Sequence, residues 1–566
     1  MRTPKAVTVL AWAVALFLIF YHLGRLPLLD PDEGRNAEVA REMKDTHSFL
    51  TPTYDGLPYL DKPAFYFDVV AVSFTLFGEN ETAARLPSAI FAVLTLLLVF
   101  LFCRRVYGLR TASLAVLVLG TTPLFFAFAR LVIFDMALTF FVCAALFAGF
   151  LALEAGSAPD GRRYYAVTAL ATAFAVLVKG PVGLVLPLLG LLAYARVAKR
   201  IGGRLFFAPA NLLIFFLPVL AWFLGVSVQR PDFPYYGIVR ETLSRLTSSS
   251  EFHRSAPWYY YFPVIVGVFF PWSMLLPELA VRGWQNRSRA AEADKLLAVF
   301  VIVVVVFFSL SQSKLPGYVL PGLVALSILV ARVFDLALRD QGSQAGWLIS
   351  RGTLLLALVS GATSGVFATQ RYGTASLFAS IHSRQFVRAQ VLFLPLILVL
   401  TLTAAAALGA RLSGSIPAMM AAYVLVPVLL LAISGKALDA FAESESSRGL
   451  AQSIRGQVLG KPEVICYRCF PPGLPFYLKR TIGVITDSGR ETTSNYIVFT
   501  LAKDSQWPTQ MVHLQDSRER LSTTRAPVLL LARAASAVPN QLIRSAPWYK
   551  LAPEWKAVLL RPQESH

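Results

Sequence analysis

Long apolar runs separated by short polar segments make up most of the first 434 residues of the chain. A helix needs about 20 predominantly apolar residues to cross the hydrocarbon core of a bilayer. About 13 runs approach this length, and we expect each to be a membrane-spanning helix. They cover residues 6–22, 86–103, 110–128, 131–153, 164–178, 181–198, 205–228, 257–278, 296–311, 315–336, 352–368, 389–410 and 415–434. The pattern predicts a polytopic α-helical membrane protein.

One further apolar run, Ala64 to Phe77, has about 14 residues and contains Asp68, so it is too short to cross. If this run stays on one side and the N-terminus is cytoplasmic, every strongly basic short loop is cytoplasmic, as the positive-inside rule requires. These loops contain Arg104, Arg105, Arg110, Arg162, Arg163, Arg196, Lys199, Arg200, Arg204, Arg282, Arg287, Arg289, Lys295, Arg339, Arg351 and Arg411. We therefore expect an interfacial or re-entrant helix at 64–77, within an extracytoplasmic loop 23–85.

This first loop begins with the polar stretch Leu29-Asp-Pro-Asp-Glu-Gly-Arg35. Pro31 interrupts the preceding chain, and the apolar spacing of the residues after it predicts a short helix from Glu33 to Lys44. Asp32 can cap this helix. Ionisable groups this close to a membrane are costly and often functional, so catalysis and capping are both open interpretations of Asp32.

The tail, residues 435–566, has no spanning run and alternates short apolar stretches with polar turns, which predicts a small α/β domain. The expected organisation is a transmembrane domain at 1–434, with extracytoplasmic loops 23–85 and 229–256, followed by an extracytoplasmic domain at 435–566. The tail contains Cys466-Tyr-Arg-Cys469. Without a second cysteine pair, a disulfide or two thiols is favoured over a zinc site.

Composition supports the membrane class, because 56% of the 566 residues are hydrophobic and only 15% are charged. The net charge of +19 would suggest a nucleic-acid partner in a soluble protein. Here the excess lies in short loops between apolar runs, so we expect membrane lipids and no nucleic acid as partners. The first run follows Arg2 and Lys5 but lacks a small-residue cleavage site, and we expect it to be an uncleaved first span.

Several bases lie in loops expected on the extracytoplasmic face, where positive charge is disfavoured. They are Lys62, Lys179, His253, Arg254 and Lys314. Arginine binds phosphate bidentately and lysine acts as a point charge, so this group can bind an anionic headgroup. Snorkelling to lipid phosphates is the better explanation for any single lysine or arginine among them, but it is weaker for four or five bases on this face. Asp135, at the start of the run 131–153, is either a functional acid or a helix cap.

The order of the polar motifs resembles that of the aminoarabinose transferases, which transfer 4-amino-4-deoxy-L-arabinose from undecaprenyl phosphate and are C-type glycosyltransferases. The motifs are Asp30-Pro-Asp-Glu-Gly-Arg35 with Ala37-Glu-Val-Ala-Arg-Glu-Met43, Tyr59-Leu-Asp-Lys-Pro63, Ala84-Arg-Leu-Pro-Ser88, Phe134-Asp-Met136, His253-Arg254 before Pro257-Trp258, and Ser313-Lys-Leu-Pro-Gly-Tyr-Val-Leu-Pro321. In the tail, Leu474-Pro-Phe-Tyr-Leu-Lys-Arg480 is also similar. The resemblance implies a bacterial inner-membrane enzyme that transfers the sugar to lipid A or another acceptor on the periplasmic side.

The resemblance also implies roles for particular residues. Asp32 would be the essential acid of the first loop, and Asp135 a second acid near the acceptor. Lys62, Arg254 and Tyr318 would hold the donor phosphate, with Tyr59 and Arg35 close by. Asp61 and His253 would be candidate ligands of a divalent ion, Zn²⁺ or Mg²⁺. These implied roles agree with the physical need for cations at a developing phosphate charge and a carboxylate at the acceptor.

This chain departs from the usual family pattern, with Asp61-Lys62-Pro63-Ala64 where Glu-Lys-Pro-Pro is typical, and with Phe67 where a Trp follows. Two alternatives stay open. One is a polyprenyl-phosphate-dependent mannosyl- or other glycosyltransferase that acts on protein or glycan. The other is a lipid transporter, which would place ionisable residues at mid-bilayer between repeated halves. The charges here gather at one face and no repeat is seen, so the transferase interpretation is favoured.

Overall fold

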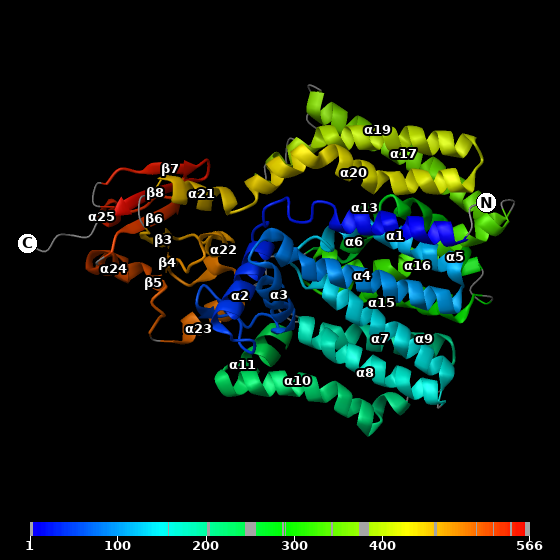
Figure 1. Ribbon diagram of the computed structural model, residues 1–566, viewed down its shortest axis with the longest axis horizontal. Helices are drawn as coiled ribbons and strands as arrows, with labels where there is room; N and C mark the ends of the chain where they lie inside the picture. Colours follow the sequence, from blue (N-terminus) through cyan, green and yellow to red (C-terminus); the bar gives the residue numbers. More distant parts are fainter. Residues whose placement is uncertain are drawn as a thin grey trace, which may run out of the picture. The chain divides into compact units, whose positions relative to one another are not determined.

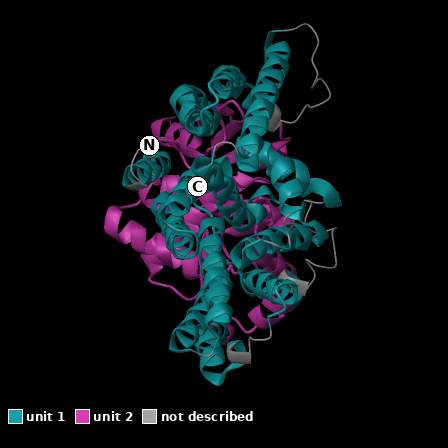
Figure 2. Ribbon diagram, turned by 90° about the vertical axis from the view of Figure 1, so that its right-hand side faces the viewer, with its two compact units in different colours: residues 1–23, 85–224, 239–441 teal, residues 24–84, 225–238, 442–566 magenta. Residues whose placement is uncertain are grey.

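The computed structural model describes residues 4–156, 158–200, 204–243, 256–285, 288, 290–340, 343–372, 384–457, 461–504, 506–524, 526–543 and 546–560. The chain divides into two compact units, coloured separately in Figure 2. Unit 1 comprises residues 1–23, 85–224 and 239–441. Unit 2 comprises residues 24–84, 225–238 and 442–566. Each unit therefore takes residues from distant parts of the sequence, and unit 2 combines the tail with the polar first loop.

Unit 1 is built from helices (Figure 1). Their bounds are α1 Pro4–Phe20, α4 Glu81–Val106, α5 Leu109–Gly120, α6 Pro123–Phe128, α7 Asp135–Ala155, α8 Pro159–Lys179, α9 Val182–Val197, η1 Arg204–Phe207, α10 Pro209–Gln229, η2 Tyr236–Leu243, η3 Trp258–Tyr260, α13 Tyr261–Val268, η4 Trp272–Leu275, α14 Leu276–Gln285, α15 Glu292–Leu310, η5 Pro316–Val319, α16 Leu320–Arg339, α17 Gln344–Tyr372, α18 Arg384–Ala389, η6 Gln390–Leu392, α19 Phe393–Leu412 and α20 Ile416–Ser444. Of these, α4, α10, η2 and α20 have residues in both units.

Eight of the described helices are long and apolar enough to cross a membrane, or nine if one bent pair is a single span. This confirms the polytopic helical class, but the number is smaller than the 13 expected spans. The expected spans 6–22 and 181–198 correspond to α1 and α9, which have only 17 and 16 residues. The span at 164–178 lies within α8, whose first turn contains Asp160, Arg162 and Arg163.

Two expected spans are interrupted at prolines. The run 110–128 forms α5 and α6, with Thr122 in an extended conformation before Pro123. A residue that precedes proline is disfavoured in the helical region, which explains the break. The run 257–278 becomes two helical segments, 258–268 and 272–285, that meet at a bend of 111° next to Pro271. Proline cannot continue the backbone hydrogen bonding of a helix.

The centre of unit 1 is formed by α5 and α16. Every α5 residue from Thr111 to Gly120 is buried, and α16 buries most of its length. A helix that is apolar all round needs neighbours on every side. Accordingly α5 packs against α1 and α16, while α16 also packs against α15, α7 and α17. A second group of contacts joins α7, α8 and α9, which brings the first turn of α7 close to the last turn of α8.

A buried acid, Asp335 of α16, lies at one end of this centre. It is fully buried and accepts hydrogen bonds of 2.9 Å from both Thr111 and Arg339. Arg332 and Arg110 lie within 3.9 Å of the same carboxylate. The buried acid is therefore the counter-ion of partly exposed arginines from two helices, α5 and α16.

We expect Asp335→Ala to destabilise the protein by about 3 kcal/mol, because it leaves buried donors without their acceptor. Thermal melting of the purified chain in detergent would show a melting temperature lower by several degrees. Asp160→Ala is the control, since Asp160 is exposed on α8 and its loss should be nearly neutral. Equal melting temperatures for the two variants would contradict a structural role for Asp335.

Unit 2 contains a six-stranded sheet with helices around it. Its elements are α2 Asp32–Thr46, β1 Thr53–Tyr54, β2 Leu57–Pro58, α3 Phe65–Phe77, α11 Phe233–Tyr235, α21 Arg448–Gln457, β3 Glu463–Tyr467, α22 Leu474–Leu478, β4 Gly483–Thr486, η7 Arg490–Thr492, α23 Asn495–Lys503, β5 Met511–His513, η8 Leu514–Asp516, α24 Ser517–Thr523, β6 Val528–Arg533, α25 Asn540–Ile543, β7 Tyr549–Ala552 and β8 Trp555–Leu560. The sheet order is β5-β4-β3-β6-β8-β7. The expected α/β fold of the tail is confirmed.

The strands β5, β4, β3 and β6 are parallel, and β8 and β7 extend the sheet in antiparallel fashion. Ile465, Ile485, Leu530 and Val558 lie in its hydrophobic core. Continuous apolar strands such as Val528–Arg533 are typical of parallel strands that are covered on both faces. Cys466 and Cys469 are buried free thiols at the end of β3, which agrees with one of the two states expected for the CxxC pair.

The first-loop elements of unit 2 follow the sequence pattern closely. The helix expected at 33–44 is α2, which begins at Asp32 and packs against α3, α22 and β1. The run 64–77 forms α3 with only 13 residues, or about 20 Å, against a hydrocarbon core of about 30 Å. Between them, Asp55-Gly56 forms a tight hairpin turn in which both residues have positive φ.

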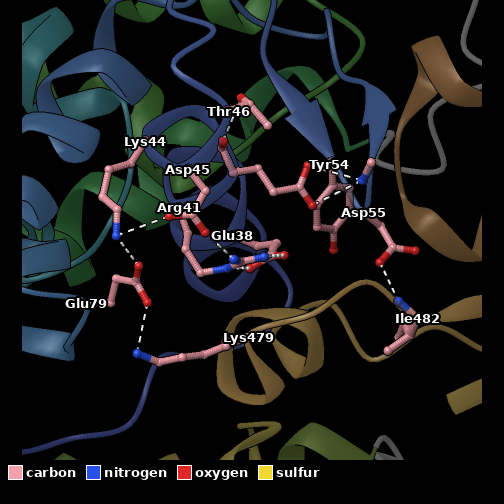
Figure 3. A network of polar contacts seen from close by, with 12 residues as sticks. Glu38, Arg41, Lys44, Asp45, Thr46, Tyr54, Asp55, Glu79, Lys479 and Ile482 are labelled. Atoms are coloured by element: carbon pink, nitrogen blue, oxygen red, sulfur yellow. Dashed lines mark hydrogen bonds and ion pairs between the residues drawn. The ribbon is translucent and has the colours of Figure 1, made fainter. Parts of the chain in front are cut away.

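Two carboxyl groups of α2, Glu38 and Glu42, and that of Asp55 in the following hairpin turn are all buried; Glu38 and Asp55 are labelled in Figure 3. Glu38 is paired with Arg41 at 2.6 Å, both Glu42 oxygens accept from the Gly56 N–H at 3.1 Å, and Asp55 accepts from the Ile482 N–H at 2.8 Å. Burial raises the pKa of Glu38 to about 8, although Arg41 opposes this, and burial raises the pKa of Asp55 well above its usual value.

The protein is therefore expected to lose stability as the pH rises. Between the unfolded pKa of 4.5 and the folded pKa of about 8, the folded state holds a proton on Glu38 that the unfolded chain has lost, so the free energy of unfolding falls across this window. Asp55→Asn should flatten this dependence and stabilise the protein near pH 8, because Asn tolerates positive φ and can still accept from Ile482.

Thermal melting at about pH 5.5 and about pH 8 measures this effect. Asp487→Asn is the matched control, since Asp487 lies in an exposed pair with Arg468. Identical pH dependence in the wild type and in Asp55→Asn would contradict a titrating role for the buried carboxyl.

Candidate functional site

Asp32, the first residue of α2, does not cap its helix. The residue before it, Pro31, makes no side-chain cap, and the Glu33 carboxylate instead accepts from the Leu29 N–H at 3.0 Å. The Asp32 carboxylate forms an ion pair of 2.5 Å with Arg35, one turn further along. Its side chain is 53% exposed. Of the two interpretations of Asp32, capping is wrong, and an accessible carboxylate remains.

Arg35 is held in place from several sides. Its guanidinium donates to the Thr493 hydroxyl at 2.9 Å, besides its pair with Asp32, and lies 5.9 Å from the ring centre of Tyr59. The Arg35 side chain is 13% exposed, and Tyr59 is buried against Tyr54 and Phe67. Burial alone would lower the pKa of Arg35, but Tyr59 and Asp32 raise it above the ordinary value. The predicted residues Asp32, Arg35 and Tyr59 thus form one cluster in unit 2.

The glycine of the first motif is required by close packing. A Cβ atom at Gly34 would lie 2.5 Å from the Gly473 Cα atom, which is closer than real carbon contacts allow. α2 therefore approaches the backbone before α22 directly. This contact gives a structural reason for Gly34 between Asp32 and Arg35, independent of any ligand.

Asp61 is held by protein donors. Its carboxylate accepts from the Tyr236 hydroxyl and from the N–H groups of Asn495 and Tyr496, at 3.0 and 2.9 Å. These two N–H groups lie at the start of α23, where a negative charge is favourable. The Lys62 ammonium donates to the Asp61 carbonyl at 2.6 Å, so the same arrangement fixes the backbone that carries Lys62.

Two donors contact Asp61 Oδ1 and one contacts Oδ2, so the carboxylate is fixed by protein contacts, and Asp61 as a metal ligand stays a prediction. Among the residues that the structure describes, no three His, Cys, Asp or Glu side chains are grouped for metal binding. The expected partner, His253, lies outside the described residues, as does Arg254.

A second cluster lies in unit 1. Asp135 begins α7 and forms an ion pair of 2.8 Å with Lys179, at the end of α8, and each side chain is 15% exposed. The Lys179 ammonium lies 5.0 Å from the ring centre of Tyr318. A Cβ atom at Gly317 would lie 2.5 Å from Phe128, so glycine lets this loop approach Asp135. Asp135 therefore does not cap α7, and Lys179 has a protein counter-ion.

Lys314 lies in the same loop as Tyr318 but has a different environment. It is only 7% exposed, and its ammonium donates to the Ser311 carbonyl. Within the described part of the chain no carboxylate pairs with it. A buried charge normally has a counter-ion, so this cation is suited to an anionic ligand.

Several residues of these clusters were not predicted from the sequence. Thr493 accepts a hydrogen bond from Arg35, while Tyr236 and Tyr496 donate to Asp61. The Tyr496 hydroxyl in turn donates to Asp232 at 2.8 Å. Ser494 caps α23, and a Ser before an apolar run is a recognisable helix start. Nothing in the sequence connects that start with Asp61, more than 430 residues earlier.

Comparisons with known proteins agree with this architecture. The family model of dolichyl-phosphate-mannose-protein mannosyltransferases matches residues 61–222. An undecaprenyl phosphate-alpha-4-amino-4-deoxy-L-arabinose arabinosyl transferase from Serratia proteamaculans is 31% identical over 327 residues, which are 57% of this chain and 59% of the relative. A second, from Pseudomonas fluorescens, is 32% identical over 361 residues, 62% of this chain and 64% of the relative. The sequence match thus spans about three fifths of these relatives.

The structural match extends further. The crystal structure of ArnT from Cupriavidus metallidurans bound to undecaprenyl phosphate has a TM-score of 0.79 and 25% identity, over 97% of both chains. The chain is therefore a multi-pass membrane protein with the C-type glycosyltransferase fold. The resemblance to the aminoarabinose transferases that the motifs indicated is confirmed.

Proposed function

We propose that this protein is an integral membrane glycosyltransferase that transfers 4-amino-4-deoxy-L-arabinose from undecaprenyl phosphate to a phosphate of lipid A. The observation that carries the proposal is the match over 97% of the chain to ArnT bound to undecaprenyl phosphate. The sugar is the one that the similar transferases from Serratia proteamaculans and Pseudomonas fluorescens are named for. Lipid A as acceptor is the expectation drawn from the motifs.

Unit 2 would supply the acid of the reaction. The Asp32 carboxylate is accessible and is oriented by Arg35. A residue that positions an acceptor needs both properties. If the acceptor is a phosphate, it is already anionic and needs little base catalysis. Asp32 would then orient the acceptor more than deprotonate it. Lys62, fixed through Asp61, is proposed to contact the donor phosphate, as is Arg254.

The cluster in unit 1, considered by itself, also has groups suited to a lipid-linked donor. Polyprenyl phosphate gains negative charge as it leaves the sugar, and preorganised cations and hydroxyl groups stabilise that charge. Lys314 is a buried cation without a described carboxylate partner, and Tyr318 lies in the same loop. Lys179 is already paired with Asp135, so we assign this pair to orienting the site rather than to neutralising phosphate. We propose a single displacement with inversion at the sugar.

We infer a bacterial inner-membrane location with the reaction on the periplasmic face. The basic loops support this orientation, because with the 13 spans expected from the sequence it places all of them in the cytoplasm. Asp32, Asp135, Lys314 and the tail then share the opposite side, where lipid A phosphates and a periplasmic sugar donor would be found.

A second candidate, mannosyl transfer to protein, is favoured by the family model that matches residues 61–222. Purified chain incubated with undecaprenyl-phosphate-linked aminoarabinose would separate the two candidates, with release of undecaprenyl phosphate followed by mass spectrometry. We expect release when lipid A is added and none with a protein acceptor. Release with the protein acceptor alone would overturn the proposed acceptor. Release only in a parallel incubation with a mannosyl donor would overturn the proposed sugar.

A further inference from the structure

Unit 2 contains an open pocket of about 250 Å³ that none of the predicted site residues lines. Three segments of the chain form it: residues 79–81 at the start of α4, one face of α21, and α22 with the residue that follows it. Pockets for drug-sized ligands are typically about 300–1,000 Å³, so this one suits a smaller group. Its α22 wall is the tail motif 474–480, to which the proposed reaction gives no role.

The α21 wall presents a regular row of side chains. Arg448, Ala451, Gln452 and Arg455 follow the i, i+3, i+4, i+7 spacing that places residues on one helix face. Arg448 and Arg455 therefore stand two turns apart along the same wall. Phe476, Tyr477 and Lys479 contribute the facing wall. The pocket thus has cationic groups on two sides and an aromatic surface between them.

The acids of the pocket are already satisfied. Glu79 is held between Lys44 and Lys479, the latter at 2.9 Å (Figure 3). Burial alone would raise the pKa of Glu79, but hydrogen bonds from these two lysines lower it below the usual value. Glu81 accepts from the Tyr477 hydroxyl at 3.2 Å and lies 3.5 Å from Arg448. Both carboxylates thus already have cationic or hydrogen-bonding partners within the protein.

The cations, in contrast, exceed the acids at one end of the pocket. The Arg455 guanidinium donates to the Tyr477 carbonyl, and within the described ranges no carboxylate pairs with it. The pKa of Arg480 is lowered, first by burial and then by the positive charge of the nearby Arg455. Two guanidinium groups brought together without an acid form an arrangement that an anion stabilises.

We propose that this pocket binds the phosphate group of a small phosphoester, either a phospholipid headgroup or a soluble sugar or glycerol phosphate, through Arg455, while Arg448 and Lys479, which are paired with Glu443 and Glu79, add positive charge beside it. Arginine suits phosphate because its planar fork donates two parallel hydrogen bonds. Tyr477 and Phe476 would cover the non-phosphate part of the ligand. The site goes beyond the proposed transfer reaction and does not depend on it, because its residues are not those of the two clusters.

The test uses full-length protein in detergent with two probes, glycerol 1-phosphate measured by thermophoresis and phosphatidylglycerol measured by native mass spectrometry. Arg455→Gln should weaken binding about tenfold. Gln452 is exposed on the same wall, so a negative or a positive charge can be introduced there without disrupting an ion pair. Gln452→Glu should weaken binding, and Gln452→Lys should strengthen it, each by about threefold.

Arg518→Gln, an exposed arginine on α24 of the same unit, is the matched control and should leave binding unchanged. Binding of both probes identifies the phosphate as sufficient, while binding of the lipid alone identifies a headgroup with its acyl chains. Binding of neither probe overturns the proposal, as does equal loss in Arg455→Gln and Arg518→Gln. If Arg455→Gln melts at a lower temperature than the wild type, the two Gln452 variants provide the test. Opposite effects of Gln452→Glu and Gln452→Lys on binding support the proposal, and equal effects overturn it.

Discussion

Asp32→Asn is expected to abolish sugar transfer while the chain still folds. The carboxylate is about half exposed and does not cap α2, so its loss removes one ion pair with Arg35 and little stability. Loss of a group that positions a reactant costs about 10²-fold in rate for a misplacement of about 1 Å, and more when orientation is lost altogether. The measurement is the transfer rate of the purified chain, with its melting temperature beside it.

Asp45→Asn is a suitable control, because Asp45 lies on the same helix, is 42% exposed and also pairs with an arginine, Arg41. It should keep full activity. Asp32→Glu should recover part of the rate, since it restores the charge at a shifted position. Full activity in Asp32→Asn would exclude Asp32 from the reaction, and an early melt of that variant would assign it a structural role instead.

Lys314→Gln is expected to weaken donor binding about 10- to 100-fold, while it leaves the ligand-free protein as stable as the wild type or more stable. The ammonium is buried and, among the described residues, its partner is a carbonyl, so its charge is unfavourable until an anion binds. Binding of undecaprenyl phosphate and the melting temperature, with and without that lipid, measure both effects.

Lys314→Arg keeps the charge and should retain part of the affinity. Lys436→Gln, at an exposed position of α20, should change neither property. A lower melting temperature for Lys314→Gln without ligand, together with unchanged undecaprenyl phosphate binding, would show that Lys314 has a purely structural role.

Much of the fold could be predicted because apolar length and helix starts are local properties. The membrane class, α2 and the short α3 all follow from runs of a few residues, and so does the α/β character of the tail. The number of spans could not be predicted equally well. Pro123 and Pro271 interrupt two apolar runs. Hydropathy alone does not show where the backbone changes direction within such a run.

The site could be predicted residue by residue but not as pairs. Asp135 and Lys179 were each identified by position, yet their ion pair depends on how the ends of α7 and α8 meet. The donors that hold Asp61 come from residues 236, 495 and 496, and the hydroxyl that holds Arg35 comes from Thr493. Such contacts exist only after long-range packing, so no local pattern reports them.

The most direct test of the central proposal is mass spectrometry of lipid A from polymyxin-sensitive cells that make the aminoarabinose donor, with and without this chain. The proposal predicts a pentose-amine mass increment on lipid A when the wild-type chain is present, and its disappearance with Asp32→Asn. The absence of any increment, with the wild-type protein present in the membrane, would contradict transfer of aminoarabinose to lipid A.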